Sequence, residues 1–158
     1  DSGKTTTLIL TTLQKLKCEM VGNAPRAVIL VEDREKALEL YDAFIKHTKY
    51  NSLRVYASYE QLHIDMQKSE IFEGIDILIS TPKTMNKLMS LNGVSTSQLM
   101  IFSIDDAEFL VQKSSYTAIM SITQSINKCQ FVLYSEKMHP ILKRFKSYFM
   151  EHSKTVTI

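Results

Sequence analysis

The chain has 158 residues, of which 44% are hydrophobic and 23% are charged, so it can bury one sizeable core and is expected to form a single domain. Nineteen basic and seventeen acidic side chains leave a formal net charge of +2, which is too small to indicate a nucleic-acid-binding surface by itself. The composition excludes an intrinsically disordered chain, and no apolar run is typical of a membrane span.

Apolar runs typical of β-strands alternate with segments of helical periodicity. The expected strands are 27–31, 53–57, 75–80, 99–104, 131–135 and 155–158. Because strands that alternate with helices are joined by right-handed crossovers, we expect an α/β fold with a mainly parallel sheet covered by helices on both faces.

Helices are expected at 6–20, 34–47, 121–126 and 141–150, and one more begins at Pro82. Asp33 is the predicted N-cap of the helix at 34–47, and Thr81 is the predicted cap before Pro82. The dipeptide Asn92-Gly93 is typical of a helix stop. The two cysteines, Cys18 and Cys129, are far apart and have no zinc spacing, which favours reduced core thiols in an intracellular protein.

The first residues of the chain are typical of a phosphate-binding loop that leads into a helix. In such a loop backbone N–H groups face the phosphates, a lysine reaches the terminal phosphates and a hydroxyl binds magnesium. The expected nucleotide-binding residues are Ser2, Gly3, Lys4, Thr5 and Thr6, with Thr5 as a metal ligand. The earlier glycine of the loop and the first strand are expected upstream, so we interpret 1–158 as one domain truncated at its N-terminus within the loop.

Two acids end the apolar run 99–104. Strands of a parallel sheet end at the edge where ligands bind, and a carboxylate there can hold a magnesium ion. Asp105 and Asp106 therefore indicate a metal and nucleotide site when read together with Lys4 and Thr5. Without that loop, the same two acids would be interpreted as ordinary residues that end a buried strand.

Taken in order, five segments resemble motifs of the first RecA-like domain of DEAD-box RNA helicases, and the resemblance covers nearly the whole chain. The first is Gly3-Lys4-Thr5, and the second is the run 25–37, in which Arg34, Glu35 and Ala37 match the family motif Pro-Thr-Arg-Glu-Leu-Ala. The third, 74–82, resembles the segment that leads into the motif Thr-Pro-Gly-Arg. The fourth is Asp105-Asp106-Ala107-Glu108 in place of Asp-Glu-Ala-Asp, and the fifth is 131–138 in place of the strand that delivers Ser-Ala-Thr.

The resemblance implies a RecA-like P-loop domain with ATP and Mg²⁺ as cofactors. It implies that Asp105 holds the metal with Thr5 and that Asp106, in place of the family's glutamate, acts in catalysis by orienting the attacking water. Its implied roles for the other motifs are RNA binding by Arg34, Thr81, Pro82 and Lys83 and coupling of the nucleotide and RNA sites by Ser135.

Several positions depart from the family pattern. Asp33 stands where the family has threonine, Ala57-Ser58-Tyr59 replaces a pair of glycines, and Lys83-Thr84 replaces Gly-Arg. An acid repels phosphate and larger side chains obstruct an RNA backbone, so these changes predict a weakened RNA surface. Asp106 is one methylene shorter than glutamate, which predicts slow hydrolysis because a misplacement of about 1 Å costs on the order of a hundredfold in rate.

Three functional interpretations remain open. The first is the ATP-binding half of an ATP-dependent RNA helicase, inactive or very slow alone, whose ATP and RNA sites are completed by a second RecA-like domain. The second is a degenerate helicase module with little or no ATPase activity that acts as an RNA- or protein-binding scaffold, as in Tudor-type germline small-RNA proteins. The third, an unrelated P-loop nucleotidase, leaves the later motifs unexplained.

The resemblance to DEAD-box helicases also implies partners and, together with the reduced cysteines, a compartment. We expect single-stranded RNA, bound weakly by this domain alone, a second RecA-like domain, protein partners and no membrane. The cytoplasm or a cytoplasmic granule is the expected location. The alternatives without a role in RNA binding are that Arg34 and Glu35 lie in the first turn of a solvated helix and that Lys83 is a surface lysine.

Overall fold

One five-stranded parallel sheet forms the centre of the computed structural model, which describes residues 2–149. In the order in which they pair, the strands are β2 (Val55–Ser58), β3 (Ile77–Ser80), β1 (Ala27–Leu30), β4 (Ile101–Ile104) and β5 (Gln130–Leu133). Ala27 is in register with Ile77 on one side and with Ile101 on the other. The central position of β1 between two parallel neighbours confirms the predicted parallel α/β sheet.

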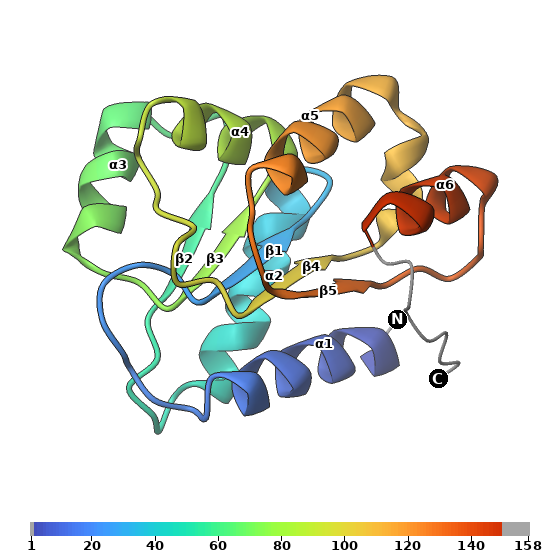
Figure 1. Cartoon of the computed structure of the whole chain (residues 1–158). Coiled ribbons are helices and arrows are strands. Elements are labelled where there is room, and N and C mark those ends of the chain that lie inside the picture. Colours follow the sequence, from blue (N-terminus) through green and yellow to red (C-terminus); the bar gives the residue numbers. More distant parts are fainter. Residues whose placement is uncertain (1, 150–158) are drawn as a thin grey trace.

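Helices cover both faces of this sheet (Figure 1). They are α1 (Ser2–Lys15), α2 (Arg34–His47), α3 (Ile64–Glu73), α4 (Pro82–Ser90), α5 (Lys113–Gln124) and α6 (Pro140–Phe149), and a 3₁₀ helix, η1, spans Ala107–Val111. One face carries α1 and α2, and the other carries α3, α4, α5 and α6. No helix in the described part of the chain is long and apolar enough to cross a bilayer.

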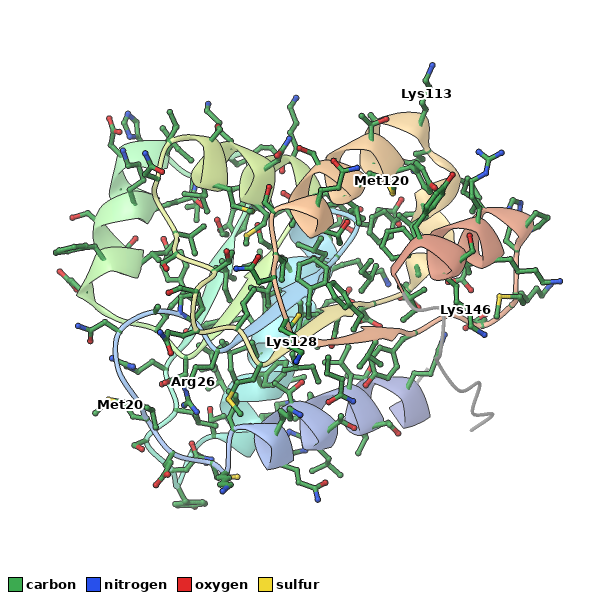
Figure 2. All side chains as sticks on the ribbon, in the orientation of Figure 1. Met20, Arg26, Lys113, Met120, Lys128 and Lys146 are labelled. Atoms are coloured by element: carbon green, nitrogen blue, oxygen red, sulfur yellow. The ribbon has the colours of Figure 1, made fainter. Side chains whose placement is uncertain are left out.

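Each face of the sheet has its own hydrophobic core, because side chains alternate between the faces along a strand. Val28 and Leu30 of β1 pack with α3 to α6, whereas Ala27 and Ile29 pack with α1 and α2. All four of these side chains are completely buried. Figure 2 shows side chains filling the space between the layers, with Lys113 pointing away from the molecule.

Sequence periodicity located α2 correctly, and Asp33 caps it by accepting a hydrogen bond of 3.0 Å from the backbone N–H of Lys36. The prediction for α1 was shifted, because the helix begins at Ser2 and ends at Lys15, before Lys17 and Cys18 adopt positive φ angles. The expected strand 155–158 lies outside the described residues. Cys18 is exposed and Cys129 is half-buried, so the prediction of core thiols was wrong for Cys18.

Two helices on the other face differ from the predictions. No helix was predicted at α3, and only residues 121–126 were predicted as helix where α5 runs over Lys113–Gln124. Helix α4 begins at Pro82 as predicted, but the Thr81 hydroxyl donates to the Glu60 carboxylate instead of capping the helix. The helix stop is confirmed, because Asn92 has a left-handed φ of 55° and the Gly93 N–H donates to the Leu88 carbonyl at 2.7 Å.

A buried carboxylate joins three chain segments at the amino ends of the strands. Asp76 precedes β3 and is completely buried. Its two oxygens accept hydrogen bonds from the Arg26 side chain at 2.9 Å and from the Arg54 Nε and backbone N–H at 3.0 and 2.9 Å. Arg26 and Arg54 lead into β1 and β2, so Asp76 fixes the relative positions of β1, β2 and β3 at this edge.

Candidate functional site

The carboxyl ends of the five parallel strands lie at one edge of the sheet, and the sequence-predicted site residues follow four of them. Arg34 begins α2 after β1, and Thr81 follows β3 directly. Asp105 follows β4 and Ser135 comes shortly after β5. The first turn of α1 is brought to the same edge, since Lys4 forms ion pairs with residues that follow β4 and β5.

Lys4 connects parts of the chain that are far apart in sequence. Its ammonium nitrogen lies 3.4 Å from an oxygen of Asp106, which is 102 positions away, and 3.6 Å from an oxygen of Glu136. The Lys4 side chain is 12% exposed, whereas those of Asp106 and Glu136 are 43% and 64% exposed. A cation at the start of a helix, where backbone N–H groups also point outward, is a favourable position for phosphate.

Asp105 and Asp106 form a pair of adjacent carboxylates at the end of β4. The Asp105 backbone N–H donates to the Leu30 carbonyl at 3.0 Å, which extends the pairing of β4 with β1 by one residue. Burial raises the pKa of Asp105, and the charge of Asp106 raises it further, against the opposing effects of a backbone hydrogen bond and of Lys4 and Lys36. A divalent cation would relieve this repulsion, so these residues fit a magnesium site.

No group of three or more His, Cys, Asp or Glu side chains among residues 2–149 is arranged to hold a metal ion. Magnesium in phosphoryl-transfer sites is commonly held by one or two carboxylates together with substrate phosphates. Asp105, the Thr5 hydroxyl and the phosphates of a nucleotide are such a set, and their roles as ligands stay predictions.

Asp106 has an unusual backbone conformation, with φ 47° and ψ 54° at the start of η1. Among residues other than glycine, aspartate and asparagine adopt this left-handed region most readily. The chain therefore makes a sharp turn directly after β4, and the shorter acid suits the turn better than glutamate does.

Glu108 ties the segment after β4 to the segment after β5. Its carboxylate accepts hydrogen bonds from the backbone N–H groups of Glu136 and Lys137, at 2.5 and 3.2 Å. The Ala107 N–H also donates to the Tyr134 carbonyl at 2.8 Å. These bonds hold residues 134–137 beside Asp105 and Asp106.

Two predicted RNA-binding residues are engaged within the protein. The Arg34 guanidinium lies over the Tyr59 ring, 5.8 Å from its centroid, which is a cation–π arrangement. The Glu60 carboxylate accepts hydrogen bonds from the hydroxyls of Thr81 and Thr84, the latter at 2.9 Å. An RNA phosphate that approached Thr81 would meet this negative charge.

The remaining predicted residues lie nearby but differ in exposure. Pro82 is buried in the first turn of α4, Lys83 is exposed and Ser135 is half-buried. No site role was predicted from the sequence for Tyr59, Glu60 or Glu136, and Tyr59 was noted only as part of the segment that replaces a pair of glycines. Their contacts span 21 or more positions, so they depend on the packing of separate strands.

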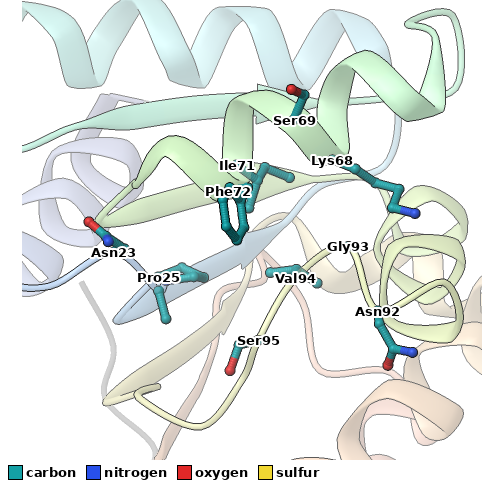
Figure 3. A pocket seen from close by; sticks show the side chains of 11 residues that line it. Asn23, Pro25, Lys68, Ser69, Ile71, Phe72, Asn92, Gly93, Val94 and Ser95 are labelled. Carbon is teal, nitrogen blue, oxygen red and sulfur yellow. The ribbon is translucent and has the colours of Figure 1, made fainter.

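A separate cavity of about 530 Å³ lies at the amino ends of the strands, at the opposite edge from Lys4. It is lined by residues 23–25, by part of α3 and by residues 92–95, and Figure 3 shows Phe72 extending toward Pro25 across it. The sequence-predicted site residues do not line this cavity.

Comparison with known proteins gives one family for nearly the whole chain. Residues 2–142 match the family model described as DEAD/DEAH box helicase. The ATP-dependent RNA helicase dbp3 of Emericella nidulans is 26% identical in an alignment of 162 positions, which covers 99% of this chain and 33% of that protein. The ATP-dependent RNA helicase DeaD of Buchnera aphidicola subsp. Baizongia pistaciae is 25% identical in an alignment of 159 positions, which covers 99% of this chain and 26% of that protein.

Solved structures show the same fold. Yeast Prp28, a DEAD-box splicing factor, has a TM-score of 0.82 at 18% identity over 95% of this chain and 38% of its own. Dbp5 of S. cerevisiae bound to RNA and ADP BeF3 also has a TM-score of 0.82, at 19% identity over 98% of this chain and 39% of its own. The chain spans between about a quarter and a third of the length of the curated relatives named above.

Proposed function

This chain belongs to the DEAD/DEAH box helicase family, and on that premise we propose that it is the ATP-binding RecA-like domain of an RNA-dependent ATPase. A second RecA-like domain would complete the ATP and RNA sites. The domain by itself would hydrolyse ATP very slowly or not at all.

The observation that carries the proposal is the approach of Lys4 to the acids after β4. The ion pair of 3.4 Å between Lys4 and Asp106 joins the start of α1 to the carboxyl edge of the sheet. Ligands of open α/β sheets bind at this edge. A lysine, a helix N-terminus and a pair of carboxylates together provide the charges that a magnesium–nucleotide complex requires.

The residues would divide the work as follows. Lys4 would contact the terminal phosphates, and Thr5 and Asp105 would hold magnesium, which neutralises charge on the phosphates when bound. Asp106 would orient the attacking water. Positioning and charge stabilisation account for most catalysis of phosphoryl transfer, so the shorter reach of Asp106 lowers the rate more than it lowers affinity.

Titration calorimetry of the full-length protein with magnesium–ATP tests this proposal. Lys4→Ala should abolish measurable heat of binding. Lys15→Ala is the matched control, since Lys15 is an exposed lysine at the other end of the same helix, roughly 16 Å away at 1.5 Å per residue. Equal affinities of the wild type and Lys4→Ala would contradict the proposal.

A second candidate function is a helicase fold that serves as a binding scaffold with little ATPase activity. The observation that favours it is the engagement of Arg34 with Tyr59 and of Thr81 with Glu60. RNA must displace these internal contacts before it reaches the predicted residues, so RNA affinity would be low.

Fluorescence anisotropy with a labelled single-stranded RNA separates the two candidates. Full-length protein that binds RNA only with an ATP analogue behaves as a helicase, whereas the same weak binding with and without nucleotide indicates a scaffold. Glu60→Gln removes the charge beside Thr81 and should raise RNA affinity roughly two- to tenfold at low salt. Glu73→Gln, an exposed acid at the end of α3, should leave RNA affinity unchanged.

A further inference from the structure

Glu136 contacts the lysine that is predicted to bind phosphate. Its carboxylate lies 3.6 Å from the Lys4 nitrogen, on the segment after β5, while Asp106 approaches the same nitrogen from the segment after β4. The corresponding position of the family motif Ser-Ala-Thr is alanine, which carries no charge. The chain therefore places one more acid beside Lys4 than the motif does.

Glu108 fixes the position of Glu136. The Glu108 carboxylate accepts hydrogen bonds from the backbone N–H groups of Glu136 and Lys137, at 2.5 and 3.2 Å. Hydrogen bonds to a charged acceptor are stronger than those between neutral groups. The backbone at 136 is thereby held beside the start of α1, and the Glu136 carboxylate is tethered within reach of Lys4.

We propose that Glu136 is a tethered competitor for the terminal phosphates of a nucleoside triphosphate at Lys4, so that it lowers affinity for the nucleotide. The inference rests on the proposed function, because it assigns Lys4 to phosphate binding. A phosphate group must replace the carboxylate at the Lys4 ammonium, and it must also approach the negative charge of Glu136. Both effects oppose binding of the triphosphate.

The exposure of Glu136 sets the size of the effect. Its side chain is 64% exposed, so water and salt screen the ion pair, and the pair contributes little to folding stability. Removing the charge should therefore leave the fold intact. Loss of the ion pair together with loss of repulsion should tighten binding roughly three- to tenfold at low salt, and the gain should shrink as salt rises.

The test measures binding of magnesium–AMPPNP, a non-hydrolysable ATP analogue, to the full-length protein by titration calorimetry. Glu136→Gln keeps the size of the side chain and removes its charge, and Glu73→Gln is the matched control at the opposite edge of the sheet. Thermal unfolding curves of the three proteins should coincide. We expect Glu136→Gln to bind about three- to tenfold more tightly at 50 mM salt and less than twofold more tightly at 500 mM salt.

Two results would overturn the inference in distinguishable ways. If the wild type binds magnesium–AMPPNP and Glu136→Gln binds with equal or lower affinity, Glu136 is not a competitor, and the proposed function stands without it. If neither protein binds, the proposed nucleotide function fails and the inference fails with it.

Discussion

The buried carboxylate of Asp76 provides the sharpest test of what holds this fold together. Asp76→Asn keeps the size of the side chain and removes its charge. Arg26, which is 7% exposed, and the Arg54 side chain, which is 27% exposed, would then both lose their counter-ion. Breaking a buried ion pair by removing one partner typically costs about 3–5 kcal/mol.

The hydrogen bonds to Asp76 give a similar value for the loss of stability in Asp76→Asn. One oxygen of Asp76 accepts from Arg54 Nε and from the Arg54 backbone N–H, and the other accepts from Val21 N–H, Arg26 Nη2 and Arg54 Nη2. The amide nitrogen of asparagine cannot accept, so whichever way the amide faces, at least two donors lose their partner. At about 1–3 kcal/mol for each unsatisfied donor, the loss is about 2–6 kcal/mol.

The loss should depend on pH in a defined direction. Burial alone raises the pKa of Asp76, but hydrogen bonds from Arg54, Arg26 and the Val21 backbone outweigh burial and hold that pKa below its ordinary value. A lowered pKa in the folded state stabilises the protein above the unfolded pKa of about 3.9, and this contribution is lost as pH falls through the folded pKa. The difference between wild type and Asp76→Asn should therefore be constant from pH 7 to pH 5 and shrink below about pH 4.

Urea unfolding followed by circular dichroism at pH 7 measures the free-energy difference. Asp42→Asn is the matched control, because Asp42 is exposed on α2 and its replacement should change stability by less than about 0.5 kcal/mol. Since whole domains are stable by about 5–15 kcal/mol, the Asp76 variant should unfold at a much lower urea concentration. A loss below about 1 kcal/mol would refute the structural role assigned to Asp76.

Three further changes have defined outcomes. Gly74→Ala should destabilise the protein by about 1–3 kcal/mol in the same urea assay, because φ is 122° there and a methyl group would collide with the Arg54 side chain. Burial raises the pKa of Cys129 to about 11, so only about one Cys129 thiol in a thousand is ionised at pH 8. Mass spectrometry should therefore show that iodoacetamide labels the exposed Cys18 first. Faster labelling of Cys129 would contradict the burial argument. Asp106→Glu should raise RNA-stimulated phosphate release by the full-length protein roughly tenfold. The same change should lower stability slightly, because the left-handed backbone conformation at position 106 suits glutamate less well. An unchanged rate would show that the length of the carboxylate side chain does not limit hydrolysis.

Local sequence signals predicted the elements whose apolar residues follow one simple period. Helix α2 has buried residues at Ala37, Leu40 and Phe44 and a capping aspartate, so its bounds could be predicted directly. Helix α3 was missed because one of its buried positions is Gln67. That side chain donates to the carbonyls of Tyr59 and Leu62, at 3.3 and 3.0 Å, and sequence periodicity treats a glutamine as a surface residue.

In the candidate site, too, motif residues could be predicted from the sequence, whereas contacts between distant segments could not. The sequence predicted that Lys4 and Asp106 belong to one site, and the structure places them 3.4 Å apart, although their roles stay predictions. Asp33 was predicted both as an N-cap and as a departure from the family pattern, whereas the contacts of Tyr59 with Arg34 and of Glu136 with Lys4 were not predicted. What Tyr59 and Glu136 contact depends on the packing of distant elements, which brings the segment after β2 beside the start of α2 and the segment after β5 beside the start of α1.

The two edges of the sheet differ in how well they tolerate substitution. Asp76 joins three strands at the amino edge, so substitution of Asp76 lowers the stability of the whole fold. At the carboxyl edge, by contrast, the Glu136 side chain is 64% exposed, and its substitution leaves the core untouched. Exposed residues at the carboxyl edge can therefore be replaced one at a time while the scaffold beneath them stays the same.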